Sequence, residues 1–506
     1  MNRSVLASAC ACVLALSCQN PPAPVTPTTP GLVSTTAPPP PEPPALLEPP
    51  APGIAPSAPF PAIIHRDLAN GLQLRVVERT AHAIAQLSLV VRSGTATDGE
   101  KPGLAAVAGE LLKAGGAGGL SSKKLVERAE ALGASLEVRS DRDSTRVTLG
   151  VTSGDFEAAL EILSMVALTP AMADGELSKL KSREMDRIKS AARGNAHWSA
   201  AMVLYRELYD LPTAVHPYSR HDVLPADIQR LTLADCRAWH KAHFVPSNAT
   251  LVVVGDVTAE RVERAASKLF AGWKGETAPT PTFSRPVLPA SRRVFLIDRP
   301  GSAQSQILVG VLGPERKSSE WPAMAAANQL LGGGVSGRLF IDVREKRSLA
   351  YGTGSSLGEV AVGPSPLLLS AATQTPKTVE AVRALLEHLQ QMGSSSPTPS
   401  ELEAATRYLA DSFVFRLETV GSIAELVGQL DVLGLPDDYY DDYRSAVREL
   451  DVTRVTAVAN RAYGATPVIV VSGDAATIGP PLAEIGPVAV LDPEQGFGLK
   501  RSYPQK

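Results

Sequence analysis

The sequence predicts an α+β protein with two homologous lobes, each a mixed or antiparallel β-sheet with helices packed on it. We expect the lobes to form a clamshell. Three observations support this fold class. The chain has 506 residues, too many for one hydrophobic core. Its strand and helix patterns occur twice in the same order, and a segment rich in Pro, Thr and Ser separates the two copies.

The composition is that of an ordinary globular protein, with 44% hydrophobic and 20% charged residues. The formal net charge is -3 at pH 7, and the chain contains no long run of Lys and Arg. A polyanion therefore has no basic surface to bind. We expect no nucleic-acid partner.

Residues 1–18 combine one arginine, an apolar run and small residues, which is the pattern of a secretory signal. The run ends in ALSC and resembles the lipobox of bacterial lipoproteins, in which the cysteine, here Cys18, is acylated. A plain cleaved signal is the alternative. The resemblance implies a lipid anchor on the periplasmic side of the cell envelope. It favours the outer membrane, because Gln19 replaces the aspartate that typically retains lipoproteins in the inner membrane.

Residues 19–61 are dominated by Pro, Ala and Thr. Such a segment cannot bury a core and favours extended polyproline conformations, so we expect a disordered tether. No later stretch offers the roughly 20 apolar residues that a transmembrane helix needs.

The internal repeat has two independent landmarks. Gly255 and Gly473 each precede an aspartate and follow a buried-strand pattern. Leu111 and Leu330 each begin a Leu-Leu pair near the glycine-rich end of an amphipathic stretch. The two pairs have almost the same offset in the chain, because 473 − 255 = 218 and 330 − 111 = 219. Two similar lobes can face each other and enclose a chamber.

These patterns set the predicted boundaries. The first lobe covers residues 62–272, and the second covers residues 293–490. Residues 273–292 form an exposed linker, since they are rich in Pro, Thr and Ser. We expect residues 491–506 to be a tail.

The stretch GLAAVAGEL at residues 103–111 identifies a family. Together with the second-repeat motif SGRLFIDVREKRSLAY at residues 336–351, it resembles the M16 peptidases: insulinase, pitrilysin and the mitochondrial processing peptidase. The resemblance covers residues 70–474 and implies two M16-type lobes. Family members continue the Gly-Leu-Ala-like turn with His-x-x-Glu-His, whose histidines hold zinc while the glutamate acts as general base.

The resemblance implies that this zinc site has been lost. Ala106 and Glu110 stand at the two histidine positions, and Gly109 stands at the base position. The family's third ligand falls near Glu184 or Asp186, which we interpret as solvated helix charges. We therefore expect this chain to bind no cofactor and Zn²⁺ to reside on a partner subunit.

Four of the eight histidines are candidate metal ligands outside the motif: His216, His221, His240 and His243. A metal role is conceivable for each of them. A packing or surface role is the commoner use of an isolated histidine, and it is our interpretation here.

Arg344 and Tyr351 match an arginine and a tyrosine that active family members carry at the same spacing. The resemblance implies that the second lobe contributes them to the zinc site of the first. A guanidinium suits bidentate binding of a carbonyl or carboxylate, and a phenol can donate to an oxyanion. The alternative is structural: Arg344 complements a helix dipole and Tyr351 packs on a strand.

Some bacterial M16 members divide the catalytic groups between two chains. The resemblance implies that this chain is the auxiliary subunit of a heteromeric zinc metalloendopeptidase, without peptidase activity of its own. Its partner would carry His-x-x-Glu-His, its substrate would be a peptide, and a lipid anchor would hold it at the membrane. The alternative is a non-catalytic structural or peptide-binding protein, like the core subunits of the respiratory bc1 complex.

Overall fold

The computed structural model describes residues 53, 58–211, 215–287 and 289–506. Every helix and strand given below belongs to the unit Pro56–Lys506. The predicted signal, the acylated Cys18 and most of the predicted tether lie outside the described residues. Within the described residues, no helix has the length and apolar character to cross a membrane.

The first sheet has six strands in the order β1-β2-β6-β3-β5-β4. Only β2 and β6 run parallel, so the sheet is mixed, as predicted. The strands are β1 (Ile64–Asp67), β2 (Gln73–Glu78), β3 (Ile84–Val91), β4 (Glu137–Ser140), β5 (Thr145–Thr152) and β6 (Ala249–Gly255).

The second sheet has seven strands in the order β13-β12-β7-β11-β8-β10-β9. From β7 to β9 it repeats the order β2-β6-β3-β5-β4, which confirms the internal duplication. The strands are β7 (Arg293–Asp298), β8 (Gln304–Glu315), β9 (Ala350–Leu357), β10 (Pro364–Gln374), β11 (Val468–Gly473), β12 (Val488–Asp492) and β13 (Gly498–Tyr503). The predicted tail therefore contains a strand of the second sheet, and this lobe extends beyond its predicted end.

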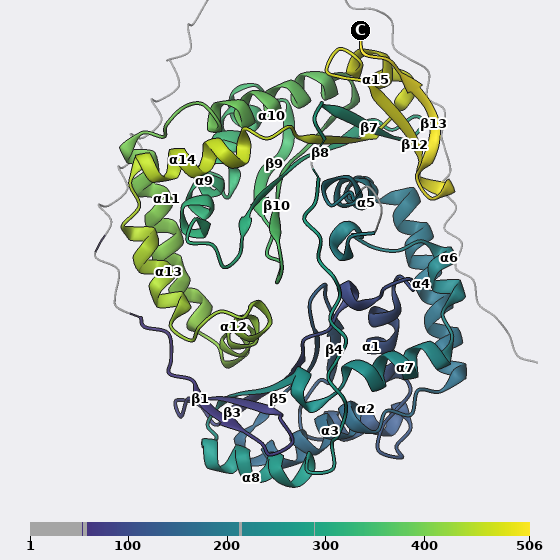
Figure 1. Ribbon diagram of the computed structural model, residues 1–506, viewed down its shortest axis with the longest axis vertical. Helices are drawn as coiled ribbons and strands as arrows, with labels where there is room; N and C mark the ends of the chain where they lie inside the picture. The colour runs from purple at the N-terminus through teal and green to yellow at the C-terminus, as the bar shows by residue number, and fades with distance from the viewer. Residues whose placement is uncertain (1–52, 54–57, 212–214, 288) are drawn as a thin grey trace, which may run out of the picture. The chain divides into compact units, whose positions relative to one another are not determined.

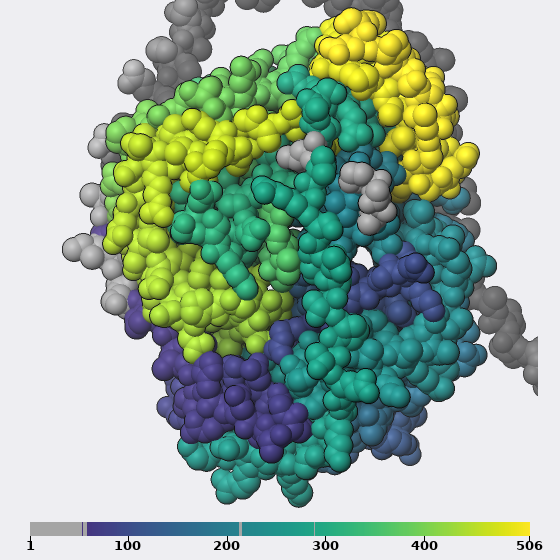
Figure 2. Space-filling view, in the orientation of Figure 1, coloured from purple at the N-terminus to yellow at the C-terminus, as the bar shows by residue number. Residues whose placement is uncertain are grey.

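Helices pack on both sheets (Figure 1). In the first half they are α1 (Leu104–Ala114), α2 (Ser122–Glu130), α3 (Phe156–Leu168), α4 (Asp174–Gly194), α5 (Ala196–Leu208), α6 (Pro225–Arg230), α7 (Leu233–His243) and α8 (Ala259–Leu269). In the second half they are α9 (Trp321–Gly332), the π-helix Phe340–Lys346, α10 (Thr378–Met392), α11 (Pro399–Asp411), α12 (Val420–Leu433), α13 (Tyr439–Arg448), α14 (Val452–Tyr463) and α15 (Ala475–Leu482). The linker residues between the two halves run over the surface (Figure 2).

Both faces of the first sheet are buried. Successive strand residues point to opposite faces, so neighbouring residues of one strand belong to different cores. On β6, Leu251 and Val253 belong to the core shared with α1 and α3. Val252 and Val254 belong to a separate core with apolar residues of α12. A helix from the second half of the sequence thus covers the other face of the first sheet.

The second sheet receives a helix from the first half in return. α5 packs on β8 and β11. Gly310 on β8 makes this approach possible, since a Cβ there would come within 2.9 Å of Leu204 and of Leu208. Each half of the sequence therefore supplies the strands of one sheet and lends a helix to the other.

Candidate functional site

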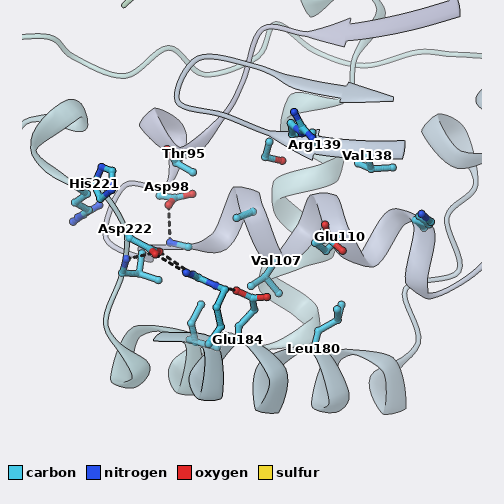
Figure 3. A pocket seen from close by; sticks show the side chains of 18 of the residues that line it. Thr95, Asp98, Val107, Glu110, Val138, Arg139, Leu180, Glu184, His221 and Asp222 are labelled. Atoms are coloured by element: carbon cyan, nitrogen blue, oxygen red, sulfur yellow. Dashed lines mark hydrogen bonds and ion pairs between the residues drawn. The ribbon is translucent and has the colours of Figure 1, made fainter. Parts of the chain in front are cut away.

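A cavity of about 450 Å³ lies against α1, and we call it the α1 pocket. Its other walls come from α4, β4 and residues 220–223. Ala106 and Glu110, at the former histidine positions, both line it. Figure 3 shows Glu110 and Glu184 reaching toward this space from α1 and α4.

A serine of the neighbouring strand β4 lies against Gly109, the position of the general base in the motif. A Cβ added to Gly109 would lie 2.5 Å from the Oγ of Ser140 on β4. That hydroxyl donates to the carbonyl of Ala105 at 3.1 Å and lies 2.9 Å from Oγ1 of Thr145. Gly109 therefore permits a close contact between helix and strand, and a glutamate at this position would require the Ser140 side chain to move.

Arginines pair with three carboxylates of the α1 pocket, those of Glu110, Glu184 and Asp222. Arg187 donates to Glu184 at 2.7 Å and to both oxygens of Asp222 at 2.8 and 3.1 Å. Arg183 lies 3.5 Å from Glu110. Burial opposes ionisation of Asp222, but hydrogen bonds from Arg187 and Trp198 hold its pKa below the usual value. Our interpretation of Glu184 as a solvated charge is wrong, since it is paired within the pocket.

This set of side chains does not fit a zinc ion. Ala106 and Gly109 offer no ligand atom, and Glu110, Glu184 and Asp222 already bind arginines. Among the described residues, no group of three or more His, Cys, Asp and Glu side chains could hold a metal ion.

The four candidate histidines make contacts with neighbouring protein groups. His240 Nε2 lies 2.8 Å from the carbonyl of Ala167, and His243 Nδ1 lies 2.9 Å from the hydroxyl of Ser93. His216 accepts a hydrogen bond from the backbone of Tyr218, and His221 stacks on Tyr205. His221 also lines the α1 pocket, where burial lowers its pKa to about 4.

Asp98 is a pocket residue that the sequence analysis missed. Its carboxylate accepts hydrogen bonds from the backbone N–H groups of Gly103 at 2.6 Å and Ala105 at 2.8 Å, at the start of α1. Burial raises the pKa of Asp98 to about 7. A residue that caps a helix normally stands directly before the first turn of that helix. Asp98 lies five residues before Gly103 and reaches the helix start across a loop, so no capping pattern in the sequence points to it.

Arg344 and Tyr351 lie side by side in the second lobe. Arg344 belongs to the π-helix Phe340–Lys346, and Tyr351 is on β9. The guanidinium carbon lies 4.5 Å from the ring centre of Phe340 and 5.4 Å from that of Tyr351. Cation–π attraction of this kind holds the guanidinium over the rings through its face, while its N–H groups point along its edge, where they can meet a polar partner.

The backbone around this pair is irregular at three places. Arg344 sits in a π-helix, a conformation often found at functional sites. Ser348 has a φ of 49°, in the left-handed region that is unfavourable for its side chain. The β9–β10 pairing passes from Gly352 to Ala350, which leaves Tyr351 as the extra residue of a bulge. Bulges re-aim side chains, and Tyr351 is 87% exposed.

The other arginines of this motif have structural partners. Arg338 makes a bidentate pair with Glu401 at 2.9 and 3.0 Å. Arg347 binds Asp342 and Glu387 at 2.9 Å each. Arg344 pairs only with its neighbour Glu345, at 3.4 Å, among the described acidic residues. Neither Arg344 nor Tyr351 lines the α1 pocket.

Comparison with known proteins identifies the family of this fold. The family model described as insulinase (peptidase family M16) matches residues 75–207, and the model described as peptidase M16 inactive domain matches residues 230–409. A crystal structure of a peptidase M16 inactive domain from Pseudomonas fluorescens is 25% identical, with a TM-score of 0.75. The match spans 81% of this chain and 98% of the crystallised chain.

Two relatives are similar to this chain, one named as a zinc protease and the other as a probable inactive metalloprotease. The zinc protease PqqE of Helicobacter pylori is 23% identical over 329 residues, which are 63% of this chain and 72% of the relative. The probable inactive metalloprotease YmfF of Bacillus subtilis is 22% identical over 280 residues, 54% of this chain and 64% of the relative. With two M16 lobes and a helix without zinc ligands, the chain belongs to the peptidase M16 family as a member of the inactive type.

Proposed function

We propose that this chain is the non-zinc subunit of a heteromeric M16 metalloendopeptidase. It contributes Arg344, Tyr351 and part of the substrate chamber, and a partner subunit carrying His-x-x-Glu-His holds the Zn²⁺. One observation carries the proposal. The second lobe presents a guanidinium beside an exposed phenol on irregular backbone, whereas α1 carries neither the two histidines nor the glutamate of the zinc motif.

The two side chains suit distinct tasks toward a peptide. The fixed fork of the Arg344 guanidinium can donate two parallel hydrogen bonds to a carbonyl or carboxylate and so align the substrate. The Tyr351 hydroxyl can donate to the negative charge that develops when water attacks the scissile carbonyl. The zinc of the partner supplies activated water. Neither task requires a metal in this chain.

The proposal extends to the place of action. Acylation of Cys18 would hold the protein at the outer membrane on its periplasmic side, and residues 19–61 would separate the folded lobes from the lipid. The partner and a peptide substrate would meet it there.

Substitution of the pair tests the shared site. A partner carrying His-x-x-Glu-His is isolated by co-purification, and peptide cleavage is measured with and without this chain. Tyr351→Phe is expected to lower kcat by about 10²-fold or more, because an oxyanion donor is lost. Arg344→Ala is expected mainly to raise KM. Arg383→Ala and Tyr408→Phe, changes at other exposed sites, serve as matched controls and should leave both constants unchanged.

A second function has one observation in its favour. The α1 pocket persists beside β4 although its catalytic groups are gone, which suits a protein that binds peptides without cleaving them. Cleavage that is equally fast without this chain, or with both substitutions, would exclude the shared site and support the binding role.

A further inference from the structure

The π-helix that carries Arg344 is fixed to α10 by a chain of polar side chains. Within this helix, the carboxylate of Asp342 lies 2.8 Å from Nε2 of His388 and 2.9 Å from Nε of Arg347. Arg347 in turn donates to Glu387 at 2.9 Å. His388 and Glu387 are neighbours on α10, so successive residues of one packed helix hold the π-helix and the residue that ends it.

The His388 side chain has no other polar contact in the described part of the chain. It is 8% exposed, and its Nδ1 has no hydrogen-bond partner among those residues. A buried polar atom without a partner lowers stability, so an apolar side chain of similar size would suit packing alone better than an imidazole. The contact with Asp342 is therefore what a histidine adds at this position.

Asp342 and Arg344 point to different sides of the π-helix. Residues two apart on a helix do not face each other. Asp342 faces α10, whereas the Arg344 guanidinium lies over the ring of Tyr351 on β9. A shift of the segment that broke the contact with α10 would therefore also move the guanidinium relative to that ring.

The turn between the π-helix and Tyr351 is held by neighbouring elements as well. Lys377 Nζ donates to the carbonyl of Ser348 at 2.8 Å, and Thr373 Oγ1 donates to the carbonyl of Leu349 at 2.6 Å. Ser348 has left-handed backbone, which persists only where the surrounding structure imposes it. With this turn fixed, the contact with α10 determines where the π-helix places its arginine.

We propose that Asp342 and His388 are positioning residues for Arg344: their contact holds the π-helix so that the guanidinium stays beside the Tyr351 phenol. Neither residue touches substrate in this arrangement. The inference rests on the proposed function, because the alignment serves a reaction only if both side chains act on one peptide.

Two substitutions of His388 separate its hydrogen bond from its volume. Leucine fills similar space but cannot donate to Asp342, whereas glutamine places an amide nitrogen near the position of Nε2 and can donate. Glu401→Gln is the matched control, because it weakens the ion pair with Arg338 in the same motif without touching Asp342. Circular dichroism and thermal melting measure the folding of each variant.

The geometry is tested in this chain alone. The Nε proton of Arg344 is followed by NMR with ¹⁵N-labelled arginine and is assigned by its loss in Arg344→Lys. The ring of Tyr351 shifts this signal, and Tyr351→Leu gives its position without the ring. His388→Leu should move the signal at least half of the way to that position, whereas His388→Gln and Glu401→Gln should leave it near its wild-type place.

The consequence for activity is measured with the co-purified partner. His388→Leu should raise KM severalfold, toward the value of Arg344→Ala, and His388→Gln should bring KM back close to wild type. In the Arg344→Ala background, His388→Leu should add nothing, because the group that it positions is already absent. A merely structural role would lower activity equally in both backgrounds.

Each negative outcome has a separate meaning. An Arg344 signal that His388→Leu leaves in place, or KM effects that add in the double variant, would overturn the positioning role. Such results leave the shared catalytic site standing if Tyr351→Phe still slows cleavage. A signal that moves as expected, while Arg344→Ala and Tyr351→Phe leave cleavage unchanged, would instead overturn the proposed function and this inference with it.

Discussion

At the scale of single residues, the loss of the zinc site involves packing as well as ligands. A glycine within a helix normally costs about 1 kcal/mol relative to alanine, so Gly109 needs a reason. Ser140 provides it by occupying the space that a side chain at position 109 would need. The helix and β4 have thus closed over the place where a general base would act.

Restoring the glutamate should therefore damage the fold without restoring activity. Gly109→Glu is expected to lower the free energy of unfolding by roughly 1–3 kcal/mol through overpacking. Ser140→Gly added to it should recover part of this loss. Gly175→Glu is the matched control, since a Cβ there meets nothing within 4 Å and the first turn of α4 favours an acid. Urea denaturation measures all four proteins, and equal effects at the two glycines would contradict this account.

At the scale of elements, the start of α1 depends on a buried carboxyl group. Asp98 accepts the N–H groups of Gly103 and Ala105, which have no partner within the helix. Gly103 has a φ of 85°, so the chain enters α1 through a left-handed residue without a side chain of its own to cap the helix.

The stability of this helix start should depend on pH. The folded pKa of Asp98, about 7, lies above its ordinary value of 3.8, so the folded state binds the proton more tightly. This contribution is full below about pH 4 and is lost as pH rises through 7. Relative to Asp98→Asn, the wild type should lose up to about 1.4 kcal/mol of unfolding free energy per pH unit within that window. Urea denaturation at each pH from 4 to 8 measures both proteins. If the unfolding free energies of the wild type and of Asp98→Asn change equally over this range, the role of Asp98 is contradicted.

The sequence predicts the repeated sheets and the lost ligands because both follow from local patterns. Ala106, Gly109 and Glu110 stand on α1 as the motif implies, and Gly255 and Gly473 end equivalent strands. Contacts between segments that are far apart in the sequence could not be predicted from such patterns. The side chain that fills the base position, Ser140, comes from β4, and no local pattern links that strand to Gly109.

At the scale of the whole folded unit, helix exchange joins the two halves. Periodicity reveals that α5 and α12 have apolar faces, but it cannot say which sheet each face covers. The structure shows α12 on β3 and β6, and α5 on β8 and β11. The predicted linker falls between the strands of the two sheets, but the predicted end of the second lobe cuts β12 and leaves β13 in the tail, and each predicted lobe lends a helix to the other sheet.

Cutting the linker should therefore leave the protein assembled. A protease site inserted between residues 276 and 284, which are mostly exposed, is cleaved after folding. Gel filtration should then show both fragments eluting together. The same fragments expressed separately should aggregate, because each exposes a sheet face that a helix of the other half normally covers. Soluble, folded single fragments would contradict the importance of the exchange.

The late position of α12 in the chain also determines how long one face of the first sheet stays uncovered during synthesis. The last strand of the first sheet ends at Gly255, but its covering helix is complete only at Leu433, after most of the second sheet has been made. At ribosomal rates of roughly 5–20 residues per second, Val252 and Val254 wait on the order of ten seconds for their cover. A nascent-chain chaperone has that interval in which to bind, and slowing translation of residues 256–433 should lengthen its occupancy.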